Sequence, residues 1–246
     1  MKINIIFLIL ALIAEITGTI GGFGSSVFFV PLGNLYFDFY SVLGLTAVFH
    51  LSSNISKIVL FKKGLNRFLL LHIGVPSVIF VILGGYLSKV VDSTFLEIVL
   101  GLFLITLSLV FLIKKELVIR SGKRESVIGG VLSGFTAGLL GTGGAIRGLT
   151  MAAFNLEKSV FIATSAFIDF MVDLSRTVVY YQNGYIHDHD LIYVPFLFVI
   201  GLAGTYIGKA MLKYIPQRTF KTISLALILL IGIITVVNFL SSERLL

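Results

Sequence analysis

Cysteine is absent from this chain of 246 residues, and charged residues make up only 13% of it. The absence of cysteine excludes disulfide bonds and thiol chemistry. The shortage of charge excludes a soluble globular domain, because a chain with 57% hydrophobic residues and so few charges cannot cover a surface exposed to water. With a mean hydropathy of +1.04, the chain is predicted to be a polytopic membrane protein.

Acidic residues are also scarce, with 12 Asp and Glu against 19 Lys and Arg, which gives a net charge of +7. Such an excess can indicate a nucleic-acid partner. Here, however, the basic residues lie in short loops between apolar runs of ~20 residues, the length of a helix that crosses a bilayer. The basic residues therefore indicate membrane topology, and the expected partner is lipid rather than nucleic acid. Because the apolar runs have the length of membrane-spanning helices, we predict an all-α fold.

Two glycine-rich stretches interrupt the apolar sequence, and a shift of 120 positions relates them. The same shift relates a Gly-x-Tyr-x-x-Lys segment in each half of the chain. The related pairs are Gly18 and Gly138, Gly21 and Gly141, Gly24 and Gly144, Gly84 and Gly204, and Lys89 and Lys209. One fixed offset over this length indicates two sequence repeats.

Each repeat is predicted to start with a glycine-broken helical hairpin and to continue with three transmembrane helices. Residues 3–36 carry a single charge, and at about 1.5 Å per residue they are too long for one crossing and too short for two. The first repeat is assigned to residues 1–113, with a hairpin at about 3–36 and spans at about 40–61, 67–88 and 94–113. Residues 114–125 form a basic linker, and the second repeat, residues 126–246, has a hairpin at about 126–154 and spans at about 159–181, 190–212 and 219–240.

The distribution of Lys and Arg favours re-entrant hairpins, which enter the membrane and return to the side they came from. If each broken segment crossed the membrane once, the basic residues would divide about evenly between the two sides. With re-entrant hairpins the second repeat is inverted, and the only basic residues outside the cell are Lys2, Lys89 and Arg244. This topology places both termini outside and the linker in the cytoplasm.

Broken backbone inside a bilayer is tolerated only where protein buries it or where it lines a cavity. Two opposed hairpins would bring Gly21–Gly24 and Gly141–Gly144 close together near the membrane midplane. Helix ends there present unpaired N–H groups and a partial positive charge, which suit an anion. We therefore predict an anion-binding site at the two breaks, although close packing of glycine-rich helices is an alternative use of the same residues.

The spans that follow the hairpins add polar residues at helical spacing, which places them on one face of each helix. These residues are His50, Asn54 and Lys57 in the first repeat and Asp169, Asp173 and Arg176 in the second. Each intramembrane charge costs ~2.5–3.5 kcal/mol on insertion scales, so these faces are expected to be wet or paired. A mutually neutralising structural cluster and a Lys57 that reaches the cytoplasmic interface are the alternative interpretations.

Arg147 follows the second break and has no acidic residue near it in the sequence, which favours a role in binding. The predicted substrate ligands are Gly21, Gly22, Phe23, Gly24, Asn54, Lys57, Gly141, Thr142, Gly143, Gly144, Arg147 and Arg176. Asp169 and Asp173 are the candidate proton carriers.

These motifs resemble the TauE/SafE sulfite exporter family of membrane permeases over nearly the whole chain. The resemblance is carried by Gly18-x-x-Gly21-Gly22-Phe23-Gly24 with the following Val30-Pro31-Leu32, by Gly138-x-x-Gly141-Thr142-Gly143-Gly144, and by the basic linker. It implies an inner-membrane secondary transporter of small sulfur-containing anions such as sulfite, thiosulfate or organosulfonates. Phe23 and Thr142 depart from the family's glycine pattern, which bears on the identity of the substrate.

Several other functions stay open from the sequence. An anion channel or a permease for a small carboxylate is the nearest alternative, followed by a scaffold subunit. An enzyme is not expected, because the membrane-embedded part holds no His-rich ligand set or Ser/His/Asp arrangement, and no cofactor is predicted. His187-Asp188-His189-Asp190 has metal-binding residue types, but beside Gly184 it is interpreted as a solvated turn, so no metal site is predicted. Glycine-rich outer helix faces are compatible with a homodimer.

Overall fold

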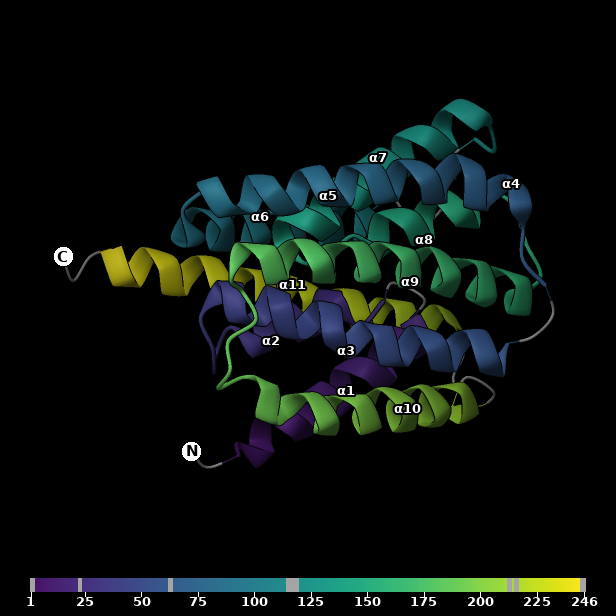
Figure 1. Cartoon of the computed structure of the whole chain (residues 1–246). Helices are drawn as coiled ribbons and strands as arrows, with labels where there is room; N and C mark the ends of the chain where they lie inside the picture. The colour runs from purple at the N-terminus through teal and green to yellow at the C-terminus, as the bar shows by residue number, and fades with distance from the viewer. Residues whose placement is uncertain are drawn as a thin grey trace.

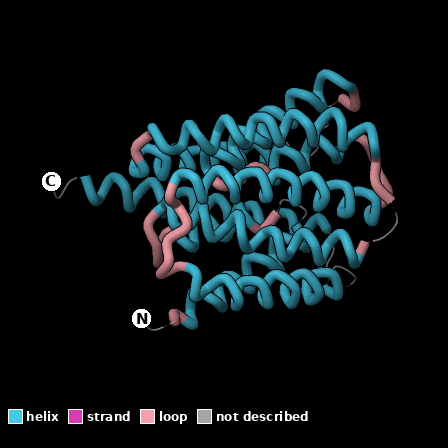
Figure 2. Tube along the Cα trace, in the orientation of Figure 1, coloured by secondary structure: helices cyan, strands magenta, loops and turns pink. Residues whose placement is uncertain are grey.

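The structure is a computed structural model, and it describes residues 3–21, 24–61, 64–113, 120–211, 214 and 217–243. Every regular element within these ranges is a helix (Figures 1 and 2). The all-α fold predicted from the sequence is therefore confirmed.

The helices follow one another through short connections, and α4, η1 and α5 join into one continuous helix, as do η2 and α10. In chain order the elements are α1 (Ile5–Gly21), α2 (Ser26–Gly33), α3 (Phe39–Leu60), α4 (Arg67–Leu69), the π-helical turn η1 (Leu70–Gly74), α5 (Val75–Val90), α6 (Ser93–Ile113), α7 (Lys123–Leu140), α8 (Gly144–Ala152), α9 (Lys158–Asn183), the 3-10 turn η2 (Leu191–Tyr193), α10 (Val194–Met211) and α11 (Gln217–Glu243).

In the described part of the chain, four helices are long and apolar enough to cross a membrane. They are Phe39–Leu60, Arg67–Val90, Ser93–Ile113 and Leu191–Met211. The outer faces of α5 and α10 expose large apolar side chains such as Ile79 and Val199, as expected for surfaces in contact with lipid. With 26 residues α9 is also long enough, but three charged residues interrupt its apolar sequence. Those charges must face protein rather than lipid.

Both glycine-rich stretches interrupt helices in the structure. In the first half α1 ends at Gly21 and α2 begins at Ser26; in the second half α7 ends before Gly141 and α8 begins at Gly144. Gly141 has a positive φ of 74°, a conformation that residues with a Cβ rarely adopt. At about 1.5 Å per residue, α2 and α8 are far shorter than the hydrocarbon core of a bilayer.

Close backbone contact holds each short arm against the long arm of its hairpin. A Cβ at Gly18 of α1 would overlap the backbone of Ser25, and a Cβ at Gly143 would overlap the carbonyl of Ser133 in α7. These glycines are therefore needed for packing as well as for the break itself.

The packing of the helices is symmetric with respect to the two halves of the chain. The fourth helix of one half packs on the first helix of the other, because α5 lies against α7 and α10 lies against α1. Equivalent helices also pair with each other, α3 with α9 and α6 with α11 (Figure 1). The equivalent glycines Gly84 and Gly204 make equivalent contacts, since a Cβ at Gly84 would overlap α7 and a Cβ at Gly204 would meet Glu15 of α1.

The described ends of the chain lie at the same end of the bundle (Figure 1). The turn between α9 and α10 also lies at that end, whereas α3 ends and α4 begins at the opposite one. The two long hairpin arms start from opposite ends, α1 near the N-terminus at the left of Figure 1 and α7 at the right.

Candidate functional site

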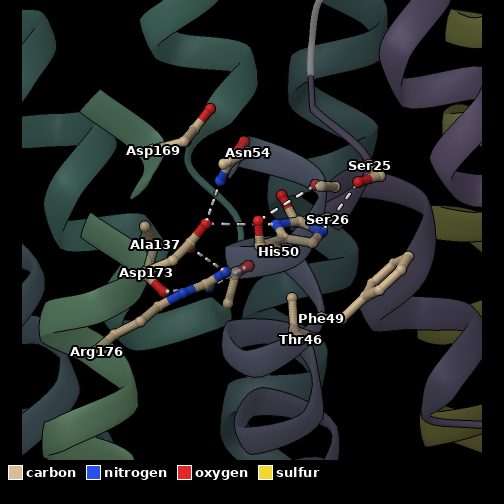
Figure 3. Close-up of polar contacts among 12 residues, drawn as sticks. Ser25, Ser26, Thr46, Phe49, His50, Asn54, Ala137, Asp169, Asp173 and Arg176 are labelled. Atoms are coloured by element: carbon tan, nitrogen blue, oxygen red, sulfur yellow. Dashed lines mark hydrogen bonds and ion pairs between the residues drawn. The ribbon is translucent and has the colours of Figure 1, made fainter. Parts of the chain in front are cut away.

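The polar faces of α3 and α9 meet in the interior of the bundle. Asn54 Nδ2 donates to Asp173 Oδ2 at 2.6 Å, and His50 Nδ1 lies 4.0 Å from the same oxygen (Figure 3). All three side chains are buried. The helical spacing seen in the sequence therefore does place these residues on facing surfaces of the two helices.

Arg176 links this cluster to the second helix break. Its Nη2 lies 2.7 Å from Asp173 Oδ1, and its Nη1 donates to the carbonyl oxygen of Gly141 at 2.8 Å. One turn along α9, the Tyr180 hydroxyl donates to the carbonyl oxygen of Gly138 at 2.7 Å. The last carbonyl groups of α7, which have no partner within the helix, are thus satisfied by side chains of α9. Arg176 was predicted as a substrate ligand, and the structure shows it engaged in neutralising Asp173 and closing this helix end.

Arg147 lies in α8, and it has an acidic partner that its sequence neighbourhood does not reveal. Its guanidinium forms an ion pair with Asp169 of α9, and its Nε donates to Ser165 Oγ at 3.1 Å. The Arg147 side chain is 3% exposed and that of Asp169 is 22% exposed. The cation is therefore buried, and its counter-ion is the more accessible member of the pair.

Lys57 pairs with Glu15, a residue that was not among the predicted ligands. Lys57 Nζ lies 2.9 Å from Glu15 Oε1, and the Glu15 side chain is fully buried. Thr19 and Thr205 each donate to Glu15 Oε1 at 3.0 Å, and Ser25 donates to Oε2 at 2.5 Å. The interpretation that Lys57 reaches the cytoplasmic interface is wrong, because this buried carboxylate holds its ammonium group in the bundle.

These contacts form a polar chain between the two helix breaks, with one gap of 4.0 Å between His50 and Asp173. Ser25, just before α2, bonds both Glu15 and His50 Nε2, the latter at 3.0 Å. From His50 the chain continues to Asp173 and Arg176 (Figure 3). It ends at the carbonyl oxygen of Gly141, which accepts a hydrogen bond from Arg176. The gap is too long for a hydrogen bond, so the polar groups lie in a row between the breaks without forming one unbroken hydrogen-bonded path.

The two breaks also touch directly. Ser26 Oγ donates to Thr142 Oγ1 at 3.3 Å, and a Cβ built on Gly24 would lie 3.8 Å from the Cα of Gly144. No side-chain hydrogen bond caps the described start of either α2 or α8. Both helix starts thus point their partial positive charges into the same region.

A cavity of about 40 Å³ lies beside this junction. Its lining residues are Gly18, Thr19, Gly24, Lys57, Phe161, Ile162, Ser165, Ala166 and Asp169. Its lining therefore includes one member of each of two ion pairs, Lys57 of the pair with Glu15 and Asp169 of the pair with Arg147. A space of this size holds water or an ion of a few heavy atoms.

The structure thus brings most of the predicted site residues close together, but only some of them line the cavity. Gly24, Lys57 and Asp169 line the cavity, and Arg147 is the partner of Asp169. Asn54, Asp173 and Arg176 lie in the polar chain between the breaks. Among the glycine-rich residues, Gly21 ends α1, Gly141, Thr142, Gly143 and Gly144 form the second break, and Gly22 and Phe23 lie outside the described residues.

The architecture and the site are those expected of a membrane transporter: a helical bundle with broken helices, buried ion pairs and a small cavity with charged residues in its lining. The family model described as Sulfite exporter TauE/SafE matches residues 7–235. The chain belongs to this family, which confirms the resemblance found in the sequence. It is also similar to a probable membrane transporter protein of Methanocaldococcus jannaschii, with 24% identity over 249 aligned residues that cover 93% of this chain and 92% of that protein. No solved structure matches the chain.

Proposed function

We propose that the protein is a secondary transporter of a small sulfur-containing anion such as sulfite, thiosulfate or a short organosulfonate. The observation that carries the proposal is the cavity at the junction of the two breaks, with Lys57 in its lining and Arg147 just behind Asp169. The family description supplies the sulfur chemistry. The small volume of the cavity favours an anion of few heavy atoms.

The charges around the cavity support an anion as the substrate. Arg147 is buried and Lys57 is 11% exposed, and each is neutralised by a carboxylate, Lys57 by Glu15 and Arg147 by Asp169. A buried cation that loses its counter-ion is strongly destabilised, so an incoming anion gains most where it takes over the role of a carboxylate. Arg147 is the better suited of the two, because its fork of N–H groups binds two oxygens of a planar or pyramidal oxyanion at once.

Asp169 supplies a means of coupling to protons. Its side chain lines the cavity and is the more accessible member of its ion pair. Protonation of Asp169 removes the negative charge that neutralises Arg147, which frees the guanidinium for the anion. Proton and anion would then bind together and leave together, as expected for proton-coupled transport. Asp173 is less suited to carry a proton, because its Oδ2 accepts a hydrogen bond from Asn54 and its Oδ1 is paired with Arg176.

The proposal includes two inverted repeats with re-entrant hairpins, in the inner membrane and with both termini outside. The pairing of α5 with α7 and of α10 with α1 supports the repeats, since exchanging the two halves converts one pair into the other. The opposite starting ends of α1 and α7 support the inversion (Figure 1). An anion bound between the breaks would be reached from either side by rocking one repeat against the other.

The substrate class can be tested by ligand-induced stabilisation of purified protein. We expect sulfite, thiosulfate and methanesulfonate to raise the unfolding temperature, and at 100 times its dissociation constant a ligand adds about 2.7 kcal/mol. Acetate and chloride at equal ionic strength serve as controls. Stabilisation by acetate alone would indicate that the substrate is a small carboxylate and not a sulfur-containing anion.

Asp169→Asn is expected to separate anion exchange from proton coupling. The amide copies the protonated carboxyl and leaves Arg147 free, so exchange of labelled anion between two equal pools should persist. Accumulation driven by a pH gradient should fall to the level of protein-free liposomes. Asp188→Asn in an exposed turn is the matched control, and it should retain both activities. Gradient-driven accumulation by Asp169→Asn at the wild-type rate would contradict the role of Asp169.

A further inference from the structure

The turn between α9 and α10 gathers two histidines and a buried aspartate at one end of the bundle. His187 Nδ1 lies 3.3 Å from Asp190 Oδ2, and His189 Nε2 lies 3.2 Å from Asp190 Oδ1. One potential ligand atom from each of the three residues lies within 4.8 Å of the other two. The two imidazole rings are stacked, with their centroids 5.2 Å apart. Both rings therefore present nitrogen atoms to a single carboxylate.

Asp190 is buried in a way that a solvated turn does not explain. Its side chain is 2% exposed, whereas those of His187 and His189 are 39% and 55% exposed. Among the described residues, Asp190 Oδ1 makes no hydrogen bond, although His189 Nε2 lies 3.2 Å from it. Nor does the side chain cap η2, the helical turn that it precedes. A buried carboxylate oxygen without a hydrogen bond is costly, and a bound cation would compensate that cost.

We propose that His187, His189 and Asp190 bind a divalent transition-metal ion, with Zn²⁺ as the best fit. Zinc bonds to His nitrogen and carboxylate oxygen are ~2.0–2.2 Å long, so neighbouring ligand atoms of a tetrahedral site lie about 3.3–3.5 Å apart. Each imidazole nitrogen lies at about this spacing from a different oxygen of Asp190, and one ligand atom from each of the three residues lies within 4.8 Å of the others, so a small closure of the turn would complete the site. Imidazole and carboxylate together suit zinc better than calcium or magnesium, which prefer oxygen ligands alone. Water completes the four ligands, and the exposed histidines give the ion access from solution.

The backbone and the packing of the turn preorganise this arrangement. The Asp190 N–H donates to the carbonyl oxygen of His187 at 2.9 Å, which closes the turn. Tyr185 anchors its start, because its ring stacks on Tyr40 at 4.5 Å and its hydroxyl lies 3.1 Å from Ser88 Oγ. The sequence alone shows the residue types but not this closure, which is why it favoured a solvated turn.

An ion at this site would fix the turn between α9 and α10 and change its contact with α3. The turn connects α9 to α10, and His187 Nδ1 also lies 2.8 Å from Ser41 Oγ in the first turn of α3. Metal binding at Nδ1 would exchange this hydrogen bond for a coordinate bond next to α3. Because α3 and α9 carry the polar faces of the transport site, loss of this hydrogen bond would loosen α3 from the turn that follows α9. The metal site does not depend on which anion is transported.

The test measures zinc binding to tag-free protein that has been treated with a chelator and dialysed. Isothermal titration with Zn²⁺ alone should show one ion per chain and a higher unfolding temperature. His189→Gln should weaken binding by more than about tenfold and abolish the thermal shift, because a ligand is lost from an exposed position that the fold does not need. His72→Gln, which changes a histidine stacked on Phe68 outside the turn, should bind zinc like the wild type.

Asp190→Asn provides the second variant, since the amide fills the same space and is a poor metal ligand. It should fold in the absence of metal and fail to gain stability from zinc. The proposal is overturned if the wild type shows no saturable binding, or if His189→Gln binds zinc with wild-type affinity.

Discussion

Arg147→Ala is expected to reduce anion exchange in proteoliposomes by at least about 30-fold, because removing a buried charged group that pairs with a ligand costs about 2–5 kcal/mol. The guanidinium is the buried cation next to the cavity, and its only ion-pair partner among the described residues is Asp169. No neighbouring side chain can replace its two-pronged contact with an oxyanion. The measurement is the initial rate of exchange of labelled sulfite at equal internal and external concentrations.

The control must separate a binding role from a structural one, because Arg147→Ala also leaves Asp169 unpaired. The double variant Arg147→Ala/Asp169→Asn removes both charges and should fold with near wild-type stability. We expect this double variant to stay inactive. Arg147→Lys should keep part of the exchange activity, and Lys89→Ala at an exposed position should keep all of it. Full exchange by the double variant would show that Arg147 serves only to neutralise Asp169.

Glu15→Gln is expected to be the most destabilising of the conservative site substitutions. It leaves Lys57 buried without its counter-ion, 2.9 Å from an amide oxygen instead of a carboxylate. Breaking a buried ion pair costs about 3–5 kcal/mol, which corresponds to a fall of roughly 6–20 °C in the unfolding temperature of a chain of this size. Because the chain has no tryptophan, the transition is best followed by circular dichroism.

The double variant Glu15→Gln/Lys57→Met distinguishes the ion pair from the hydrogen bonds around it. If the unpaired ammonium causes the loss, removing it should recover most of the unfolding temperature. If the contacts of Glu15 with Thr19, Ser25 and Thr205 dominate instead, the double variant will be as unstable as Glu15→Gln alone. That result would show that the hydrogen bonds of Glu15, and not its ion pair with Lys57, cause the loss of stability.

The helices and their interruptions could be predicted from the sequence because each has a local physical cause. Apolar runs of a set length predict the spans, and rows of glycine inside such a run predict a break. The structure adds a reason that spacing does not show. Gly18 and Gly143 are needed because another backbone segment of the same hairpin passes close to them.

The pairing of the charges could not be predicted, because it depends on contacts between distant segments. Glu15 is visible in the sequence as a lone charge in a long apolar stretch, a signal that should have marked it as part of the site. Its partner Thr205, however, lies in the other half of the chain. Likewise, only the fold shows that Asp169 neutralises Arg147, whereas Asp173 neutralises Arg176. Residue types and helical spacing predicted which faces of α3 and α9 are polar. They did not predict the order in which those polar residues contact one another.

The most direct test of the account is counterflow of radiolabelled sulfite, thiosulfate and methanesulfonate in proteoliposomes that contain the wild-type protein. Liposomes preloaded with unlabelled anion should accumulate label transiently, and the initial rate should saturate with concentration. Saturable counterflow of at least one of these anions, lost in Arg147→Ala, is the predicted result. Flux that does not saturate would indicate a channel, and an absence of flux for all three anions, with counterflow of a carboxylate instead, would contradict the sulfur-anion transporter.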